Sequence, residues 1–490
     1  MMINRTVPPL HLHIGDRMVA EGAGGVHQHV FPATGEVQGL VPLAGRSDVD
    51  AAVVAAQKAF AGWRAWKPAD RARVLGRLAE LIQRDADELA RLAVLDNGMT
   101  LSTGKVSAGA MAQYTGYYAR WADKIEGRVT SVPAQSRELA YTIPDPYGVV
   151  AIIMTWNSPM FSVGMKLAPA LAAGNTVVLK PSELTPYTSE RLMTLVRESG
   201  IPDGVVNLLL GGAEAGDALV RHPLVQKVSF TGGPATARKI LAACAESIKP
   251  AVLELGGKSA NLIFPDADLD TAAMITTYTV NGVLAGQGCA IASRMLVHED
   301  VYDEVAEKVV EQVRAMRYGD PFDPATTITP VITKAAQTRI LGMIDRARAE
   351  GGGTLLIGGG VPSELTGTEL EGGFFVEPTV FGDVVPASEL GQVEVFGPVL
   401  SLIRFSTEDE AVEIANATEY GLASYAYTKD IDRIARLTTR LQAGGVYING
   451  AQPVLGCELP FGGIGISGFG REGGLEGLLE FVRTKAVAIA

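Results

Sequence analysis

The fold is decided by five apolar runs: VVAIIM (149–154), TVVLK (176–180), VVNLLL (205–210), VQKVSF (225–230) and AVLEL (251–255). Each run has the length of a buried strand, and helical stretches separate them. Strands joined by crossover helices form a parallel sheet with helices on both faces. We therefore expect an α/β fold with a doubly wound sheet, which binds ligands at the carboxyl ends of its strands.

The segments on either side extend this pattern. Residues 47–97 have helical periodicity, and a second alternating block from 261 to 449 predicts another α/β domain. Its strand candidates are RMLVH (294–298), VLSLIRF (399–405), SYAYT (424–428) and GVYIN (445–449). Two isolated strand-like segments, within 131–147 and at 481–489, have no partner nearby in sequence. We expect them to pair elsewhere in the fold or with another subunit.

Composition excludes several classes of partner. The net charge of −12 disfavours binding to nucleic acid or to an anionic membrane surface. Three cysteines, and no apolar secretory segment at the N-terminus, indicate a reducing compartment, so we predict a cytoplasmic protein. His27 and His29 have no third ligand nearby and are interpreted as surface histidines, so no metal site is expected.

One thiol and one carboxylate stand out as a reactive pair. Cys289 lies in AGQGCA (285–290), and Glu254 opens ELGGK (254–258). A cysteine is a strong nucleophile once its thiol loses a proton, and a positioned carboxylate can take that proton or later activate water. The pair therefore predicts covalent chemistry on a carbonyl carbon.

Four polar motifs follow strands of the predicted parallel sheet: WNSP (156–159), KPSE (180–183), FTGG (230–233) and ELGG (254–257). Because the carboxyl ends of parallel strands meet at one edge, these motifs are expected to line a single crevice.

Together with GQGC (286–289), EVFGP (394–398) and PFGGIGISGFGRE (460–472), these motifs resemble the NAD(P)-dependent aldehyde dehydrogenase superfamily over nearly the whole chain. The resemblance implies two doubly wound α/β domains and a small β oligomerisation arm, in a homodimer or homotetramer. Its implied divisions are an NAD-binding domain (1–130 and 148–255), a catalytic domain (256–450) and the arm (131–147 and 470–490).

The resemblance also assigns catalytic roles. Cys289 is expected to attack the aldehyde and form a thiohemiacetal, with the oxyanion held by the amide of Asn157 and the Cys289 N–H. Loss of hydride to the cofactor would leave a thioester, and water activated by Glu254 would hydrolyse it to the acid. Relatives that acylate coenzyme A generally lack this base, so the non-acylating, hydrolytic reaction is expected.

The implied cofactor is NAD rather than NADP. Lys180 and Glu183 resemble the pair that binds the adenine-side ribose, and a carboxylate there repels a 2′-phosphate. Glu394 and Phe396 resemble residues at the nicotinamide, and Trp156 and the 231–233 turn are expected near the pyrophosphate. The full set of expected cofactor residues is Ile153, Trp156, Lys180, Glu183, Phe230, Thr231, Gly232, Gly233, Leu255, Glu394 and Phe396.

Departures from the family pattern bear on the substrate. Ser158 and Gly288 stand where relatives often have larger residues, which predicts a roomy pocket. The loop 452–459 is mostly apolar and has no Arg or Lys, so we expect a neutral apolar or aromatic aldehyde. Two other readings remain: a catalytically silent binding or structural homologue, and an esterase that does not use NAD.

Overall fold

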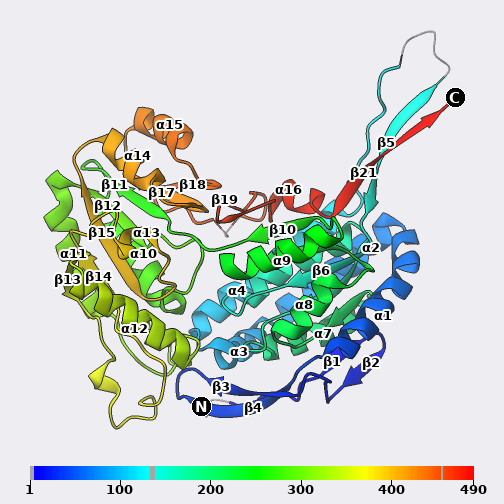
Figure 1. Cartoon of the computed structure of the whole chain (residues 1–490), viewed down its shortest axis with the longest axis horizontal. Coiled ribbons are helices and arrows are strands. Elements are labelled where there is room, and N and C mark those ends of the chain that lie inside the picture. The colour runs from blue at the N-terminus through cyan, green and yellow to red at the C-terminus, as the bar shows by residue number, and fades with distance from the viewer. Residues whose placement is uncertain (1–4, 133–137, 454–455) are drawn as a thin grey trace.

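The computed structural model describes residues 5–132, 138–453 and 456–490. Two large sheets form separate bodies, and a two-stranded arm extends from one of them (Figure 1). No helix in these described ranges is long and apolar enough to cross a membrane.

The first sheet has the strand order β2-β1-β8-β7-β6-β9-β10-β20. Its strands are β1 (Leu12–Ile14), β2 (Arg17–Val19), β6 (Val149–Ile153), β7 (Thr176–Lys180), β8 (Val206–Leu208), β9 (Val225–Thr231), β10 (Ala251–Glu254) and β20 (Gly468–Phe469). The five predicted strands, β6 to β10, are all parallel, as expected. The chain reverses its direction of progress across the sheet between β6 and β9, and such a switch point leaves a crevice beyond the strand ends.

Helices cover both faces of this sheet, and several come from the N-terminal region. They are α1 (Arg46–Ala65), α2 (Pro68–Arg84), α3 (Ala86–Asn97), α4 (Leu101–Trp121), α5 (Pro159–Ser162), α6 (Ala168–Ala172), α7 (Tyr187–Ser199), α8 (Ala213–Arg221) and α9 (Pro234–Glu246). A π-helical turn, η1 (Val163–Leu167), joins α5 to α6. The apolar faces of these helices and the sheet form the largest hydrophobic core of the molecule.

The second sheet has the order β13-β14-β15-β12-β11-β17-β18, and only β13 is antiparallel. Its strands are β11 (Ala260–Ile263), β12 (Arg294–His298), β13 (Thr354–Ile357), β14 (Thr379–Gly382), β15 (Val399–Phe405), β17 (Ala423–Tyr427) and β18 (Gly445–Ile448). Its helices are α10 (Leu269–Thr277), α11 (Tyr302–Ala315), α12 (Lys334–Ala349), α13 (Glu389–Gln392), α14 (Glu408–Asn416) and α15 (Ile431–Arg440). The expectation of two α/β sheets is therefore confirmed.

The two isolated strand-like segments pair with each other. β5 (Leu139–Pro146) and β21 (Val482–Ile489) are antiparallel along their full length and form the arm in Figure 1. Asp145 fixes the base of the arm, because its carboxylate accepts from Lys485 at 2.6 Å and from Arg64 of α1 at 2.5 Å. Residues 133–137, part of the predicted arm, lie outside the described residues.

A second hairpin corrects one sequence interpretation. β3 (Val26–Phe31) pairs with β4 (Glu36–Pro42), and His29 on β3 is buried rather than on the surface. The hairpin packs His29 against the body, where its Nε2 lies 3.0 Å from the Leu184 carbonyl oxygen. Burial lowers the pKa of His29 to about 4, so the ring is neutral at physiological pH.

Candidate active site

Cys289 lies at the end of a strained loop between the two bodies. After α10 come a π-helical turn, η2 (Tyr278–Gly282), and a tight turn, η3 (Val283–Gly286). In η3, Leu284, Ala285 and Gly286 all have positive φ, at 50°, 47° and 72°. This backbone conformation is unfavourable for residues with side chains and persists only where the surrounding structure enforces it. Such conformations are frequent at functional sites. Here it redirects the chain so that Cys289 faces the end of β10.

The side chain of Gln287 holds this turn in place. Its Nε2 donates to the Leu284 carbonyl at 2.7 Å, and its Oε1 accepts from the Ile332 N–H at 3.0 Å. Gln287 is buried, so both bonds lie away from solvent. The residue two places before the nucleophile therefore anchors the loop to the second body.

The glycines of ELGG allow three segments to meet. A Cβ on Gly257 would lie 2.3 Å from the Cys289 carbonyl oxygen, and one on Gly256 would lie 2.2 Å from Oε2 of Glu394. The Gly257 N–H also donates to Oε1 of Glu394 at 3.0 Å. Only glycine permits such close backbone approach, so this turn brings Cys289 and Glu394 to the end of the strand that carries Glu254.

The Asn157 side chain has a fixed orientation. Its Oδ1 accepts from the Thr155 hydroxyl, and its Nδ2 donates to the Gln287 carbonyl at 2.9 Å. One Nδ2 hydrogen remains for another acceptor. Asn157 and Cys289 line the same two cavities, so the geometry suits a donor to an oxyanion formed at the cysteine.

Glu254 is the last residue of β10 and is only 3% exposed. Neither of its carboxyl oxygens has a hydrogen-bond partner in the described parts of the chain. Burial, and secondarily the negative charge of Glu472, raises the pKa of Glu254 well above its usual range. A carboxylate with a raised pKa binds a proton more strongly and is a better general base near neutral pH.

The Cys289 thiol is in its neutral form at rest. It is accessible from the cavities but shielded from bulk water, and this burial raises its pKa to about 12, with smaller contributions from Glu394 and Glu254. A thiol with such a pKa needs a base to become a nucleophile. Water in the cavity can take that proton as the thiol attacks a substrate.

The structure adds a buried pair that the sequence interpretation missed. Lys166 forms an ion pair with Glu472 and donates to the Ser229 hydroxyl at 2.9 Å. The π-helical turn η1 carries Lys166, and π-turns are frequent at functional sites. Glu472 ends the quoted PFGGIGISGFGRE motif, but no local pattern marks Lys166 as its partner.

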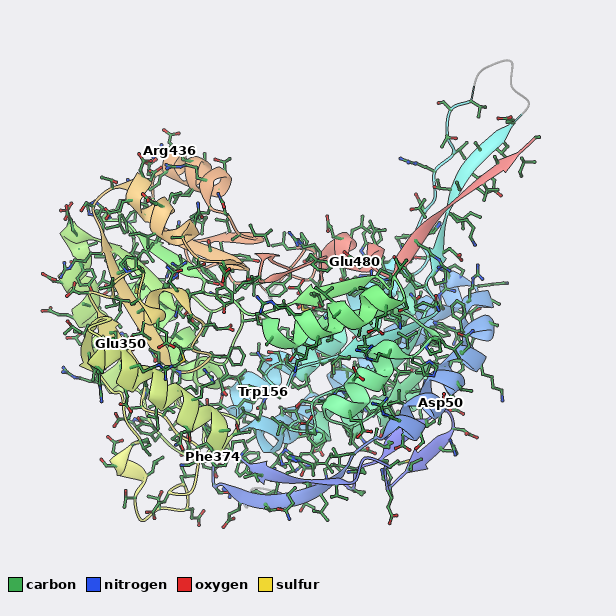
Figure 2. The ribbon with its side chains drawn as sticks, in the orientation of Figure 1. Asp50, Trp156, Glu350, Phe374, Arg436 and Glu480 are labelled. Atoms are coloured by element: carbon green, nitrogen blue, oxygen red, sulfur yellow. The ribbon has the colours of Figure 1, made fainter. Side chains whose placement is uncertain are left out.

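All eleven predicted cofactor residues line one cavity of about 600 Å³ at the switch point of the first sheet. Trp156, which lies centrally between the two bodies in Figure 2, packs edge-on against Phe396 at 5.5 Å between ring centroids. Lys180 donates to the carbonyls of Pro181 and Gly211, which fixes its ammonium at the strand end.

This cavity has free groups that suit a nucleotide. The buried hydroxyl of Thr231 has no partner among the described residues, and α9 begins beside it with no side-chain cap at Gly233. The N-terminus of a helix favours phosphate. The donor set at 231–233 therefore fits a pyrophosphate.

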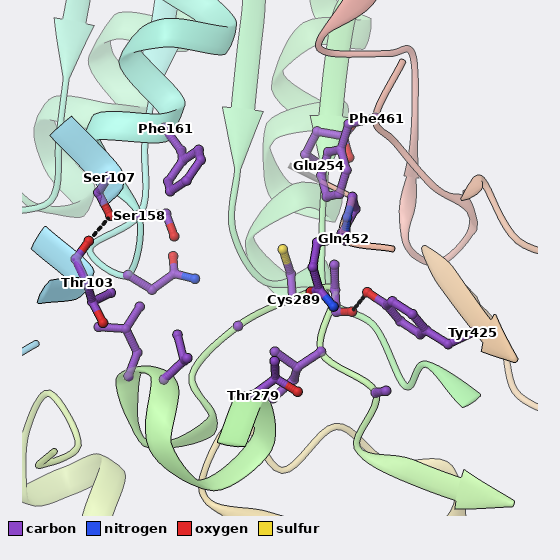
Figure 3. Close-up of a pocket in the computed structure, with 18 of the residues that line it drawn as sticks. Thr103, Ser107, Ser158, Phe161, Glu254, Thr279, Cys289, Tyr425, Gln452 and Phe461 are labelled. Atoms are coloured by element: carbon purple, nitrogen blue, oxygen red, sulfur yellow. Dashed lines mark hydrogen bonds between the residues drawn. The ribbon is translucent and has the colours of Figure 1, made fainter. Parts of the chain in front are cut away.

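A second cavity of about 280 Å³ meets the first at Cys289, Asn157, Thr155 and Thr231. Figure 3 shows Cys289 between a wall that carries Thr103, Ser107, Ser158 and Phe161 and a wall that carries Tyr425, Gln452 and Phe461. Of the predicted entrance loop, Gln452 and Pro453 line this cavity, whereas Val454 and Leu455 lie outside the described residues. A Cβ on Gly288 would lie 2.9 Å from Cγ2 of Ile291, so Ile291 fills much of the space that Gly288 leaves.

A cluster elsewhere, of His11, His13 and Glu190, has the composition of a metal site. The ring nitrogens of His11 and His13 lie 3.1 and 3.0 Å from the two oxygens of Glu190. Nδ1 of His13 also faces the Arg197 guanidinium. These contacts tie β1 to α7.

Comparisons with known proteins agree with this site. The model of the aldehyde dehydrogenase family matches residues 20–487. The chain is 41% identical over 466 residues to the mitochondrial aldehyde dehydrogenase of Mesocricetus auratus, covering 94% of this chain and 91% of that protein. The chain belongs to the aldehyde dehydrogenase family and is an oxidoreductase of that class.

Solved structures extend the similarity to three dimensions. The structure of PnpE in complex with nicotinamide adenine dinucleotide has a TM-score of 0.95 and 39% identity, covering 98% of each chain. Betaine aldehyde dehydrogenase from Staphylococcus aureus, solved as a point mutant with NAD+ and a BME-modified Cys289 of its own, has a TM-score of 0.94 and 35% identity. That match covers 98% of this chain and 97% of the other.

Gly257→Ala tests the close approach of the ELGG turn to the nucleophile loop. We expect at least a hundredfold loss of kcat, because the new methyl group must displace the Cys289 carbonyl. A misplacement of about 1 Å at a reacting group can lower the rate by about that factor. The measurement is steady-state NADH formation alongside a melting curve. The control is Gly62→Ala in α1, where a Cβ meets nothing within 4 Å. Equal rates in the two variants would contradict the argument.

Proposed function

We propose that this enzyme oxidises an aldehyde to the carboxylic acid with NAD, through a thiohemiacetal and a thioester on Cys289. The observation that carries the proposal is the position of Cys289. It lies where a nucleotide-sized cavity and a smaller cavity meet, beside the unpartnered carboxyl group of Glu254.

The first step is attack of the Cys289 sulfur on the aldehyde carbon. The thiol proton passes to water in the cavity as the carbon–sulfur bond forms, and the carbonyl oxygen becomes an oxyanion. The free Nδ2 hydrogen of Asn157 and the Cys289 N–H hold that oxyanion, and one such donor is typically worth about 3 kcal/mol in the transition state. The bonds from Thr155 and to Gln287 preset the Asn157 amide, so it does not reorganise during the reaction.

The bound nicotinamide supplies a hydride acceptor. Glu394, Phe396 and Trp156 are the residues that would orient it at the junction of the two cavities. Phe396 has a positive φ of 48°, so its ring position is set by a backbone shape that side-chain-bearing residues rarely adopt.

Hydrolysis of the thioester completes the reaction. A water molecule that enters beside Glu254 loses a proton to the carboxylate and attacks the acyl carbon, which releases the acid and the Cys289 thiolate. Glu254 then passes that proton to the thiolate, which restores the resting enzyme. Burial, and secondarily the negative charge of Glu472, raises the pKa of Glu254 and so its basicity. A base in this position supports transfer to water rather than to coenzyme A.

Glu254→Gln separates the two halves of the reaction. We expect a rapid first burst of NADH followed by turnover at least a hundredfold slower than wild type, because the thioester forms but no carboxylate activates water. Stopped-flow absorbance measures both phases. A steady-state rate equal to wild type would show that Glu254 is not the base.

The same assay decides between the remaining alternatives. A silent binding homologue forms no NADH with any aldehyde, and an esterase hydrolyses esters at the same rate with or without NAD. The intact set of Cys289, Glu254 and Asn157 favours the dehydrogenase.

We propose that the enzyme prefers NAD to NADP because of Glu183, which lines the larger cavity. Its carboxylate accepts hydrogen bonds from ribose hydroxyls and repels a 2′-phosphate. In the wild-type enzyme, kcat/KM should favour NAD at least tenfold, and Glu183→Gln should reduce that ratio because the repulsion is lost. A wild-type ratio that favours NADP would contradict this role.

The substrate we propose is a neutral apolar or aromatic aldehyde. The smaller cavity contains the aromatic rings of Phe161, Tyr425, Tyr427 and Phe461. The described lining residues include no Lys or Arg that could hold a substrate carboxylate, whereas Glu254 and Glu472 would repel one.

We also propose that the β5–β21 arm joins subunits in a homodimer or homotetramer, with 1–130 and 148–255 as the NAD-binding domain and 256–450 as the catalytic domain. The arm extends from the body and exposes Leu139, Ile143 and Ile489. The location in the cytoplasm stays a prediction, and the protein from Mesocricetus auratus is described as mitochondrial.

Light scattering tests the role of the arm. The wild-type chain should have at least twice the mass of one subunit, and Ile143→Asp with Ile489→Asp should lower that mass because charges replace the apolar contacts. A monomeric wild type would contradict the proposal.

A further inference from the structure

Two helices line one wall of the smaller cavity with pairs of hydroxyl residues. Thr103 and Ser107 lie four positions apart on α4, and Ser158 and Ser162 lie four positions apart at the two ends of α5. Thr103 and Ser107 share a face of α4 at this spacing, whereas Ser158 is the N-cap of the four-residue helix that ends at Ser162. Because α4 and α5 pack together, the four side chains form one surface, here called the hydroxyl wall.

The hydroxyls of this wall differ in whether they already have a partner. Ser107 donates to the Thr103 carbonyl at 2.9 Å, and the Thr103 hydroxyl bonds to that of Thr100 at 2.9 Å. Ser158 and Ser162 make no side-chain hydrogen bond with any described residue. Ser162 is only 7% exposed, and its side chain lines the cavity.

Ser162 is therefore a largely buried residue of the cavity lining whose hydroxyl can donate and accept. Leaving such a group without a partner costs free energy, which a polar ligand group can recover. The neighbouring Ser158 directly follows Asn157, so the two free hydroxyls lie near the place where the aldehyde carbonyl is held.

The opposite side of the cavity is formed mainly by aromatic rings. Figure 3 places Tyr425, Gln452 and Phe461 across from Thr103, Ser107 and Ser158, with Cys289 between them. The Tyr425 hydroxyl donates to the Ala290 carbonyl at 2.6 Å, so Tyr425 presents mainly its ring to the cavity. A planar ring with a polar group on one edge matches both surfaces.

We infer that the hydroxyl wall selects aromatic aldehydes that carry a neutral hydroxyl substituent, through hydrogen bonds to Ser158 and Ser162. This inference rests on the proposed function and narrows its substrate class. A carboxylate substituent is disfavoured, because Glu254 and Glu472 are the only charged side chains among the described lining residues.

The test compares hydroxybenzaldehydes with methylbenzaldehydes at the same ring position, because the two substituents are similar in size. We expect kcat/KM to favour the hydroxyl compound about tenfold at the best of the three positions, as a site built to bond a hydroxyl discriminates against an analogue without one. Ser158→Ala with Ser162→Ala should reduce that ratio to near one, and Ser162→Thr, which keeps the hydroxyl, should retain most of it.

Thr279→Val is the matched control. Thr279 lines the same cavity, but its hydroxyl already donates to the carbonyls of Ile275 and Thr276. The ratio in this variant should equal the wild-type ratio. If the double variant fails to fold in a melting curve, the two single alanine variants replace it, and each should lower the ratio.

The outcomes separate the two proposals. A wild-type ratio near one at all three positions, or a ratio unchanged by the alanine variants, would overturn the hydroxyl wall while oxidation of benzaldehyde leaves the dehydrogenase standing. Failure to oxidise any aldehyde would overturn the proposed function, and the substrate class with it.

Discussion

The active site depends on the close contact between the ELGG turn and the nucleophile loop. The first body contributes Glu254 at the end of β10, and the second body contributes Cys289 on the loop before β12. The backbone of Gly257 lies directly against the Cys289 carbonyl, and that of Gly256 lies against the Glu394 carboxyl. A side chain at either position would separate the base, the nucleophile and the nicotinamide-side carboxylate, so these two glycines set the geometry of the reaction.

This contact also concentrates acidic groups in a buried space. Glu254, Glu394 and Cys289 all have raised pKa values because burial disfavours their charged forms, and that of Glu394 rises to about 7. Lys166 is the cation that pairs with Glu472 at the edge of the group. Burial thus keeps the Cys289 thiol protonated until a substrate is present to receive its charge.

The sequence predicted the chemistry better than the architecture. Lys180, Thr231 and Glu254 end strongly apolar strands, so the topology rule for parallel sheets places them at one edge, and the structure gathers them there. The N-terminal strands β1 to β4 were not predicted, because β1 and β2 have only three residues each and the β3 and β4 sequences, VHQHVF and EVQGLVP, lack a continuous buried apolar run. Helix α4 was also missed, because its many small residues give a weak apolar periodicity.

Partnerships across long sequence separations account for the rest. Lys166 lies in an apolar run, and only the fold brings it to Glu472. The polar role of Ser158 and Ser162 depends on which face of a one-turn helix meets the cavity, and the sequence alone suggested only that Ser158 removes bulk. The extra room expected beside Gly288 is partly filled by Ile291, a contact that no local pattern shows.

Mass spectrometry of the trapped acyl-enzyme tests the central claim most directly. Glu254→Gln is mixed with NAD and benzaldehyde, quenched in acid and digested. The peptide that contains Cys289 should carry a benzoyl group in an amount equal to the NADH formed, and no adduct should form without NAD. NADH formed without any acyl group on Cys289, or an acyl group on Cys457 instead, would contradict the account.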